Sequence, residues 1–84
     1  LLPDTFPCAI GNMAAYCSIV IQSELISRLH ACIYREDGAF YLEDMNSTNG
    51  TFLNGRRLLP KERQLLSAGD MVGFANLLYK VEKS

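Results

Sequence analysis

The sequence predicts an all-β fold, a β-sandwich built from short strands. Short apolar runs alternate with turn-forming residues along the chain, and no stretch keeps a helical period for long. Strand and turn together recur about every eight to twelve residues, a spacing that is typical of sandwiches. Two Asn-Gly pairs, Asn49-Gly50 and Asn54-Gly55, add the strongest local signal for tight reversals.

The strands are expected where β-branched, aromatic and aliphatic residues gather between turn signals. In chain order they are 6–10, 18–21, 31–35, 40–43, 51–53, 57–59, 70–74 and 77–81. Residues 22–29 have only a weak helical pattern, so we interpret them as a loop that could hold one helical turn.

Three hairpins connect these strands. Asp37-Gly38 should close the first, Asn54-Gly55 the second and Ala75-Asn76 the third. The last hairpin brings together two closing strands, whose apolar residues can reach the core. The core residues expected from them are Met71, Phe74, Leu78 and Val81.

Length and charge restrict the class of protein. The chain has 84 residues and a mass of 9.4 kDa, with eight basic and nine acidic side chains and a formal net charge of -1. Such a balance disfavours nucleic-acid binding. No apolar run approaches the roughly 20 residues that cross a bilayer, and the start lacks a signal-peptide pattern. We therefore expect no membrane insertion, and a cytoplasmic domain or a cytoplasmic part of a larger protein.

Three cysteines, Cys8, Cys17 and Cys32, are an odd number without a Cys-x-x-Cys pair. Buried free thiols in a reducing compartment explain them better than disulfides do. Together with His30 they match no usual zinc-ligand spacing, so we expect no metal and no cofactor.

A set of motifs gives the chain a family resemblance. In order they are "AIGN" (9–12), "SRLHA" (27–31), "LED" (42–44), "STNGTFLNG" (47–55) and "LLSAGDMVGF" (65–74). Over residues 6–81 the chain resembles the forkhead-associated (FHA) domain, and its compact form resembles bacterial members. The resemblance implies that residues 1–84 are one antiparallel β-sandwich domain, excised from a larger protein. Either its first strand lies upstream or this is a shortened version.

The resemblance also implies a function. Loops at one end of the sandwich would recognise phosphothreonine in a partner protein, for which charged and short polar donors are suited. The implied phosphopeptide-binding residues are Asn12, Ser27, Arg28, Thr48 and Asn49. Ser27 would donate to the phosphate, Thr48 would line the pocket for the threonine methyl, and Asn49 would bond to the peptide backbone. The implied structural residues are Gly11, His30, Gly50, Asn54, Gly69 and Asp70.

Asn12 departs from the family pattern, which has an arginine there as the principal phosphate ligand. A neutral amide is a weaker partner for phosphate than a guanidinium. Two hypotheses therefore stay open: a phosphothreonine reader, or a degenerate domain that makes phosphate-independent contacts or assemblies. Arg56 and Arg57 are interpreted as hairpin surface, with a peptide contact as the alternative.

Catalysis is not expected. An enzyme would have to use Ser27, or a cysteine, with His30, and the chain has a single histidine for every acid, base or orienting role. The resemblance explains the Ser-x-x-His pair as a structural motif, so we predict a binding module.

Overall fold

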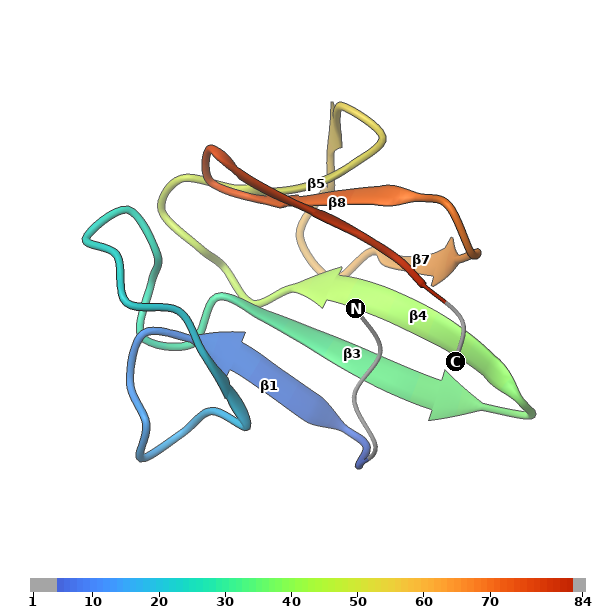
Figure 1. The fold of residues 1–84 in the computed structure, drawn as a ribbon, viewed down its shortest axis with the longest axis horizontal. Helices are drawn as coiled ribbons and strands as arrows, with labels where there is room; N and C mark the ends of the chain where they lie inside the picture. The colour runs from blue at the N-terminus through green and yellow to red at the C-terminus, as the bar shows by residue number, and fades with distance from the viewer. Residues whose placement is uncertain (1–4, 83–84) are drawn as a thin grey trace.

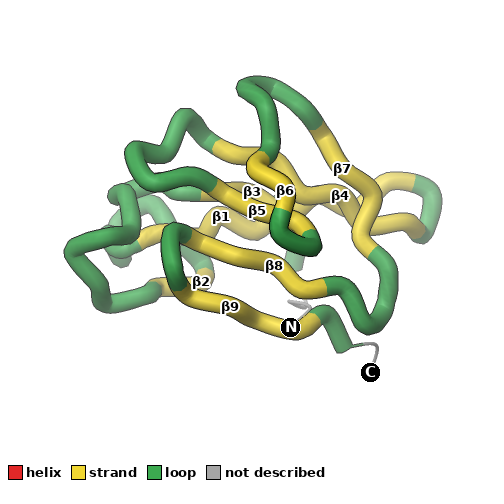
Figure 2. Tube along the Cα trace, turned by 90° about the horizontal axis from the view of Figure 1, so that it is seen from above, coloured by secondary structure: helices red, strands yellow, loops and turns green. Residues whose placement is uncertain are grey.

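The computed structural model describes residues 5–82, which form two packed β-sheets and no helix (Figure 1, Figure 2). One sheet has the strand order β2-β1-β3-β4-β7 and the other β6-β5-β8-β9. This arrangement confirms the predicted sandwich. The strands are β1 (Cys8–Gly11), β2 (Ile19–Val20), β3 (Ala31–Glu36), β4 (Ala39–Asp44), β5 (Thr51–Leu53), β6 (Arg56–Arg57), β7 (Arg63–Leu66), β8 (Met71–Phe74) and β9 (Leu77–Lys80).

The three predicted hairpins are confirmed. Asp37 and Gly38 have φ values of 51° and 79° between β3 and β4, and Asn54 and Gly55 have 50° and 86° between β5 and β6. Positive φ at both central residues matches the right-handed twist of the flanking strands. Ala75, with φ of 56°, reverses the chain between β8 and β9. Among the strands within residues 5–82, β1 and β2 pair in parallel, whereas the other pairs are antiparallel.

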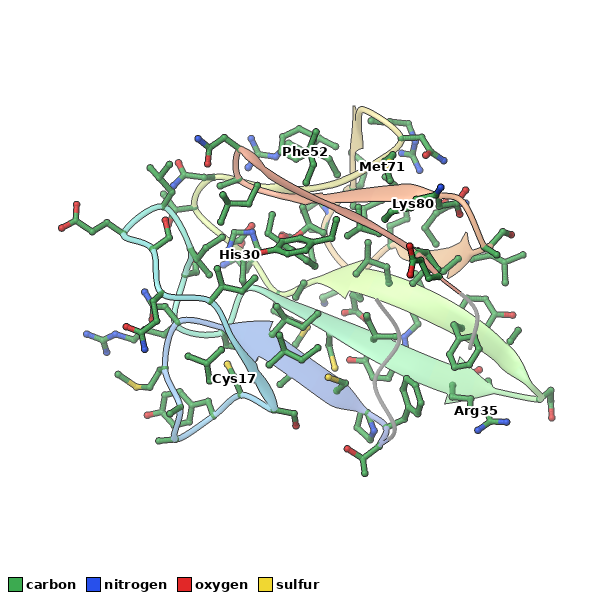
Figure 3. The ribbon with its side chains drawn as sticks, in the orientation of Figure 1. Cys17, His30, Arg35, Phe52, Met71 and Lys80 are labelled. Atoms are coloured by element: carbon green, nitrogen blue, oxygen red, sulfur yellow. The ribbon has the colours of Figure 1, made fainter. Side chains whose placement is uncertain are left out.

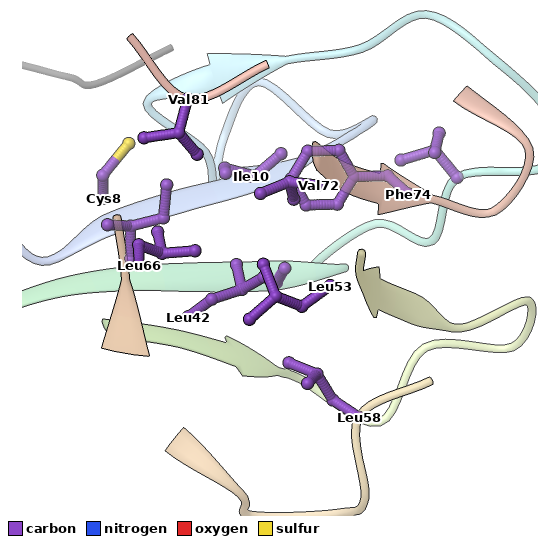
Figure 4. Packing of buried hydrophobic residues seen from close by; sticks show 12 residues of the cluster. Cys8, Ile10, Leu42, Leu53, Leu58, Leu66, Val72, Phe74 and Val81 are labelled. Carbon is purple, nitrogen blue, oxygen red and sulfur yellow. The ribbon is translucent and has the colours of Figure 1, made fainter. Parts of the chain in front are cut away.

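The core lies between the two sheets (Figure 4). Ile10 and Leu42 of the first sheet and Val72 and Phe74 of the second are almost fully buried. Alternate residues of each strand point inward, because successive side chains of a strand face opposite sides of the sheet. Val81 also packs into this core just beyond β9.

Two of the expected core residues were assigned wrongly. Met71 is 37% exposed and Leu78 is 66% exposed, whereas Phe74 and Val81 are buried as predicted. The register pairs Leu78 with Gly73, next to the buried Val72 and Phe74. Leu78 therefore belongs to the outer face of the second sheet, where the pleat also places Met71.

The strand prediction also has errors. β7 was not predicted, and the strand expected at 57–59 is instead Arg56–Arg57. Residues 22–29 form a loop with turns and no helix. The expectation about the first strand, that it lies upstream or that the domain is shortened, concerns a part of the chain outside the described residues. Within residues 5–82 no helix is long and apolar enough to cross a membrane.

Candidate functional site

Three loops gather at one end of the sandwich. They connect β1 to β2 (residues 12–18), β2 to β3 (residues 21–30) and β4 to β5 (residues 45–50), and Figure 1 shows them together on its left side. The sheets fix where these loops begin and end. They contain Asn12, Ser27, Arg28, Thr48 and Asn49, so the fold brings the five predicted contact residues to the same end of the molecule.

The His30 side chain connects the loop of residues 21–30 to the loop of residues 45–50. Its Nδ1 accepts a hydrogen bond from the Ser27 backbone N–H at 3.1 Å, and its Nε2 lies 2.8 Å from the Gly50 carbonyl oxygen. Because Nδ1 accepts, Nε2 carries the proton and donates to Gly50. The ring is fully buried between the layers, edge-on to Phe74 with centroids 5.8 Å apart (Figure 3). Because both ring nitrogens bond to the backbone of the loops, His30 holds the two loops together.

Two direct hydrogen bonds also connect the loop of residues 21–30 to the loop of residues 45–50, and we call this pair of bonds the latch. The Ser27 hydroxyl oxygen accepts from the Thr48 backbone N–H at 3.1 Å. Asn49 Nδ2 donates to the Leu25 carbonyl oxygen at 2.8 Å. Thr48 and Asn49 are nevertheless exposed. The latch thus holds two predicted contact residues in place while it leaves them open to a ligand.

A buried carboxylate organises the Ser47–Gly50 turn, and sequence reasoning did not identify it. Asp44 accepts from the Ser47 backbone N–H at 3.2 Å, from the Ser47 hydroxyl and from the Thr51 hydroxyl at 2.7 Å. The Ser47 oxygen in turn accepts from the Gly50 N–H at 3.0 Å. Ser47 and Thr51 flank the Thr-Asn-Gly segment in the sequence, and this spacing was the available signal for such a network.

Asn12 is tied to the neighbouring loop. Its Nδ2 donates to the Ile26 carbonyl oxygen at 2.6 Å, and its backbone N–H donates to the Ser27 carbonyl oxygen at 3.0 Å. Gly11 lets the loops approach, because a Cβ there would collide with the Arg28 backbone. Asn12 also lines an open hollow of about 480 Å³ together with Gln22, Ser23 and Glu24.

The cations near the loops differ in their pairing. Arg28 is exposed, and its guanidinium makes no hydrogen bond or ion pair with the described residues. Arg56 is paired with Glu62 at 2.6 Å and also donates to Gln64. The Glu62 carboxylate raises the pKa of Arg56, and the pKa of Glu62 is lowered in return. Arg28 therefore remains available to an anion.

The other predicted structural residues lie elsewhere. Asn54 Nδ2 donates to Asp70 Oδ1 at 3.2 Å, and Asn54 Oδ1 accepts from the Met71 N–H at 2.9 Å. Asp70 Oδ2 accepts from the Ser67 N–H, and Gly69 has φ of 94° in the same turn. These bonds join the β5–β6 hairpin to the turn before β8. They do not contribute to the three-loop site.

The three-loop end presents polar groups together with a cation. Its loops carry hydroxyl and amide side chains and the unpaired guanidinium of Arg28, which are the kinds of group that suit a ligand with several acceptor oxygens. His30 Nδ1 bonds the backbone of Ser27 and not its hydroxyl, so the pair lacks the nucleophile–base contact of a hydrolase. Among the described residues, no cluster of three or more His, Cys, Asp or Glu side chains could hold a metal ion.

Comparison with known proteins identifies the family. The FHA domain model matches residues 8–75, so this chain belongs to the FHA family. The protein FraH of Nostoc is 48% identical over 50 residues, which are 60% of this chain and 17% of FraH. The chain spans less than a fifth of the length of the curated relatives that it matches.

Solved structures agree with this assignment. The FHA domain of CT664 from Chlamydia trachomatis has a TM-score of 0.86 at 27% identity, over 99% of this chain and 81% of that one. The N-terminal FHA domain of Rad53p from Saccharomyces cerevisiae has a TM-score of 0.70 at 37% identity, over 77% of this chain and 52% of that one. The latter structure is a complex with a phosphothreonine peptide.

Proposed function

We propose that this domain is an interaction module that binds threonine-phosphorylated proteins through its three-loop end. Membership of the FHA family supports the proposal. Two similar FHA domains, of Rad53p and of MEK1, were solved with phosphothreonine peptides, and they are 37% and 30% identical to this chain. We place the module in the cytoplasm as one FHA domain of a larger protein.

The observation that carries the proposal is the latch between the loops. Ser27 bonds to Thr48, and Leu25 bonds to Asn49, so two hydrogen bonds within the domain join segments that are about twenty residues apart in the sequence. A site that is already ordered loses less conformational entropy when a ligand binds. This preorganisation suits recognition of a short peptide on a shallow surface.

The groups that face the ligand have donors to spare. The Ser27 oxygen accepts from Thr48, so its own hydrogen is free for a phosphate oxygen. Asn49 uses one amide hydrogen on Leu25, and its second hydrogen and its oxygen remain for the peptide backbone. The exposed Thr48 side chain provides a methyl contact for phosphothreonine.

The positive charge of the site comes from Arg28. Asn12 spends one amide hydrogen on the Ile26 carbonyl, so it contributes at most one neutral donor to a ligand. Neutral hydrogen bonds are roughly half as strong as charge-assisted ones. Binding therefore depends on Arg28 for the charge-assisted part of the phosphate contact, and we expect a modest affinity.

A peptide-pool experiment tests the proposal. Degenerate peptides with a fixed central phosphothreonine are captured on the immobilised domain, beside identical pools with threonine or phosphoserine. We expect enrichment from the phosphothreonine pool, weaker binding of phosphoserine, which lacks the methyl group, and none of threonine. Individual peptides are then titrated by fluorescence anisotropy.

Two variants make the result specific. Ser27→Ala removes the hydroxyl donor, and Arg28→Gln removes the charge while it keeps a polar side chain. Both should weaken phosphopeptide binding several-fold or more. Arg35→Gln is the control, because Arg35 lies on β3, away from the loops (Figure 3). Equal affinity for phosphorylated and unphosphorylated peptides would instead favour a phosphate-independent contact module.

A further inference from the structure

Arg57 lies against Gly50, in the β4–β5 loop that also carries Thr48 and Asn49. A Cβ atom placed on Gly50 would be 2.8 Å from Arg57 Nε and 3.1 Å from Arg57 Cζ. The guanidinium therefore covers the Cα of Gly50, and it can do so because Gly50 has no side chain. Gly50 has φ of 92° and is buried, although its neighbours Thr48 and Asn49 are exposed.

The strand pairing explains how Arg57 reaches this position. The β5–β6 hairpin leaves the site at Thr51, turns at Asn54-Gly55 and returns, so that Arg57 lies opposite Phe52. The next residue, Leu58, donates its N–H to the Thr51 carbonyl oxygen at 2.8 Å. The long side chain of Arg57 then extends along the sheet to the loop. Residues that the sequence places in a separate hairpin thus adjoin the site.

The charge of Arg57 is not neutralised by the described residues. Its guanidinium makes no hydrogen bond and no ion pair there, and its side chain is exposed. The neighbouring Arg56 differs, because Glu62 and Gln64 occupy its guanidinium. Two adjacent arginines of one short strand therefore have different environments, and only Arg57 is oriented toward the ligand-binding loop.

The distance from Arg57 to the peptide-binding groups is short. Consecutive Cα atoms are 3.80 Å apart, so the guanidinium lies no more than about 8 Å from the Cα of Asn49. An extended peptide advances about 3.4 Å per residue, so a side chain two or three positions from the residue held at Asn49 can reach Arg57. Glu24 lines the hollow beside Asn12, so an acidic side chain of the peptide would be repelled there.

From these observations we propose that Arg57 forms a second anion subsite, which takes an acidic side chain of the peptide near the phosphothreonine. The inference rests on the proposed phosphopeptide binding. An arginine fork suits a carboxylate, because it can donate two parallel hydrogen bonds. Arg57 is thus a specificity-determining residue, separate from the phosphate contacts of Ser27 and Arg28.

A peptide scan tests the subsite. Starting from a phosphothreonine peptide selected by the pools, glutamate or glutamine is placed in turn at each flanking position, and affinities are measured by anisotropy. We expect glutamate to bind about threefold to fivefold more tightly than glutamine at one position, within about three residues of the phosphothreonine. Arg57→Gln should remove that difference. Arg56→Gln is the matched control and should keep it.

A charge exchange sharpens the test. Arg57→Glu should reverse the preference at that position, so that lysine in the peptide binds better than glutamate. An absent preference in the wild type, or a preference that survives Arg57→Gln, overturns the Arg57 assignment while phosphate dependence stays intact. Binding without phosphate dependence overturns the proposed function and this inference together. All variants are exposed at the altered position, and circular dichroism confirms their fold.

Discussion

Asn12 bonds to the Ile26 carbonyl oxygen within the domain, at the position where the family resemblance implies an arginine. Replacing Asn12 by arginine restores a charged donor beside Ser27 and should raise the affinity for phosphothreonine peptides. A gain of about 2 kcal/mol, on the order of thirtyfold, is expected from a charge-assisted contact. Isothermal titration with matched phosphorylated and unphosphorylated peptides measures it.

The control for this substitution is Asn12→Ala. It also removes the bond to the Ile26 carbonyl oxygen, which should lower the free energy of unfolding by about 1 kcal/mol, but it adds no charge. Its affinity should not rise. If Asn12→Arg gains nothing, or gains equally for the unphosphorylated peptide, the loops are not arranged around a phosphate as we propose.

His30 is predicted to stabilise the domain through its two ring nitrogens. His30→Ala leaves the Ser27 N–H without its partner and removes one of the two donors to the Gly50 carbonyl oxygen, which keeps its bond from the Ala75 N–H. It also opens a cavity beside Phe74. The expected loss is about 3–5 kcal/mol, which is a large part of the stability of a small domain. Urea unfolding checks this. A loss below about 1 kcal/mol would contradict the structural role.

Single residues of the site differed in how well the sequence predicted them. Ser27, Thr48 and Asn49 belong to contiguous motifs that carry the family resemblance, so the sequence alone was enough to propose them as contact residues. Asp44 was recognised only as part of the "LED" motif, because Ser47 and Thr51 become its hydrogen-bond partners only when the chain turns between them. The Asn54-Gly55 turn fixes the register of its hairpin, but the contact of Arg57 with Gly50 also depends on the path of the β4–β5 loop, which no local pattern specifies.

At the scale of elements, β7 is a strand that the hydrophobic pattern of the sequence did not predict. Only Leu66 of this strand is buried, so its apolar signal is weak. Arg63 lies opposite Glu43, and its guanidinium also contacts Glu36 and the face of Tyr34, 3.7 Å from the ring centroid. Cross-strand contacts of this kind stabilise a sheet edge but are visible only once the strands are paired.

The wrong core assignment of Met71 and Leu78 has the same origin. Both residues are apolar, and their apolar character alone predicted that they would be buried. The phase of β8 is set by Val72 and Phe74, and β9 follows it through the pairing of Leu78 with Gly73. Because the side-chain period of a strand is two, fixing one residue inside fixes its neighbours outside. The hydrophobic pattern located both strands to within about one residue, but it did not predict which of their side chains face the core.

The β4–β5 loop should lose order if its buried network is weakened. Thr51→Val keeps the shape of the fully buried side chain but removes the hydroxyl that donates to Asp44. A charged acceptor then loses one partner, at a cost of about 1–3 kcal/mol. Urea unfolding measures the cost, and amide exchange at Gly50 should become faster.

Thr51→Ser is the matched control for the network. It keeps the hydroxyl and removes only the methyl group, which should cost about 1 kcal/mol and leave the exchange of the Gly50 amide unchanged. If serine and valine have the same effect on exchange, the methyl packing orders the loop and the hydrogen bond does not.

At the scale of the whole molecule, folding buries two thiols that the unfolded chain exposes. Cys8 is fully buried and Cys32 nearly so, and both cysteines are free, as predicted, while Cys17 is half-buried. Burial raises the pKa of the Cys8 and Cys32 thiols above 9.0. The charges of Cys32 and Cys17 add to the pKa shift of Cys8, whereas a hydrogen bond with Tyr34 opposes the pKa shift of Cys32. Burial raises the pKa of Tyr34 as well. All three groups therefore stay protonated in the folded state at neutral pH.

The stability should consequently fall at alkaline pH. In the unfolded chain the thiols ionise at lower pH than in the folded domain, so their contribution is fully present below pH 9 and is lost as pH rises toward the folded pKa. Each thiol can contribute a slope of at most about 1.4 kcal/mol per pH unit. Thermal unfolding from pH 7 to pH 10.5 should show the melting temperature falling most steeply above pH 9. Cys8→Ala and Cys32→Ala should each make that fall shallower, whereas an unchanged fall in both would mean that other groups cause it.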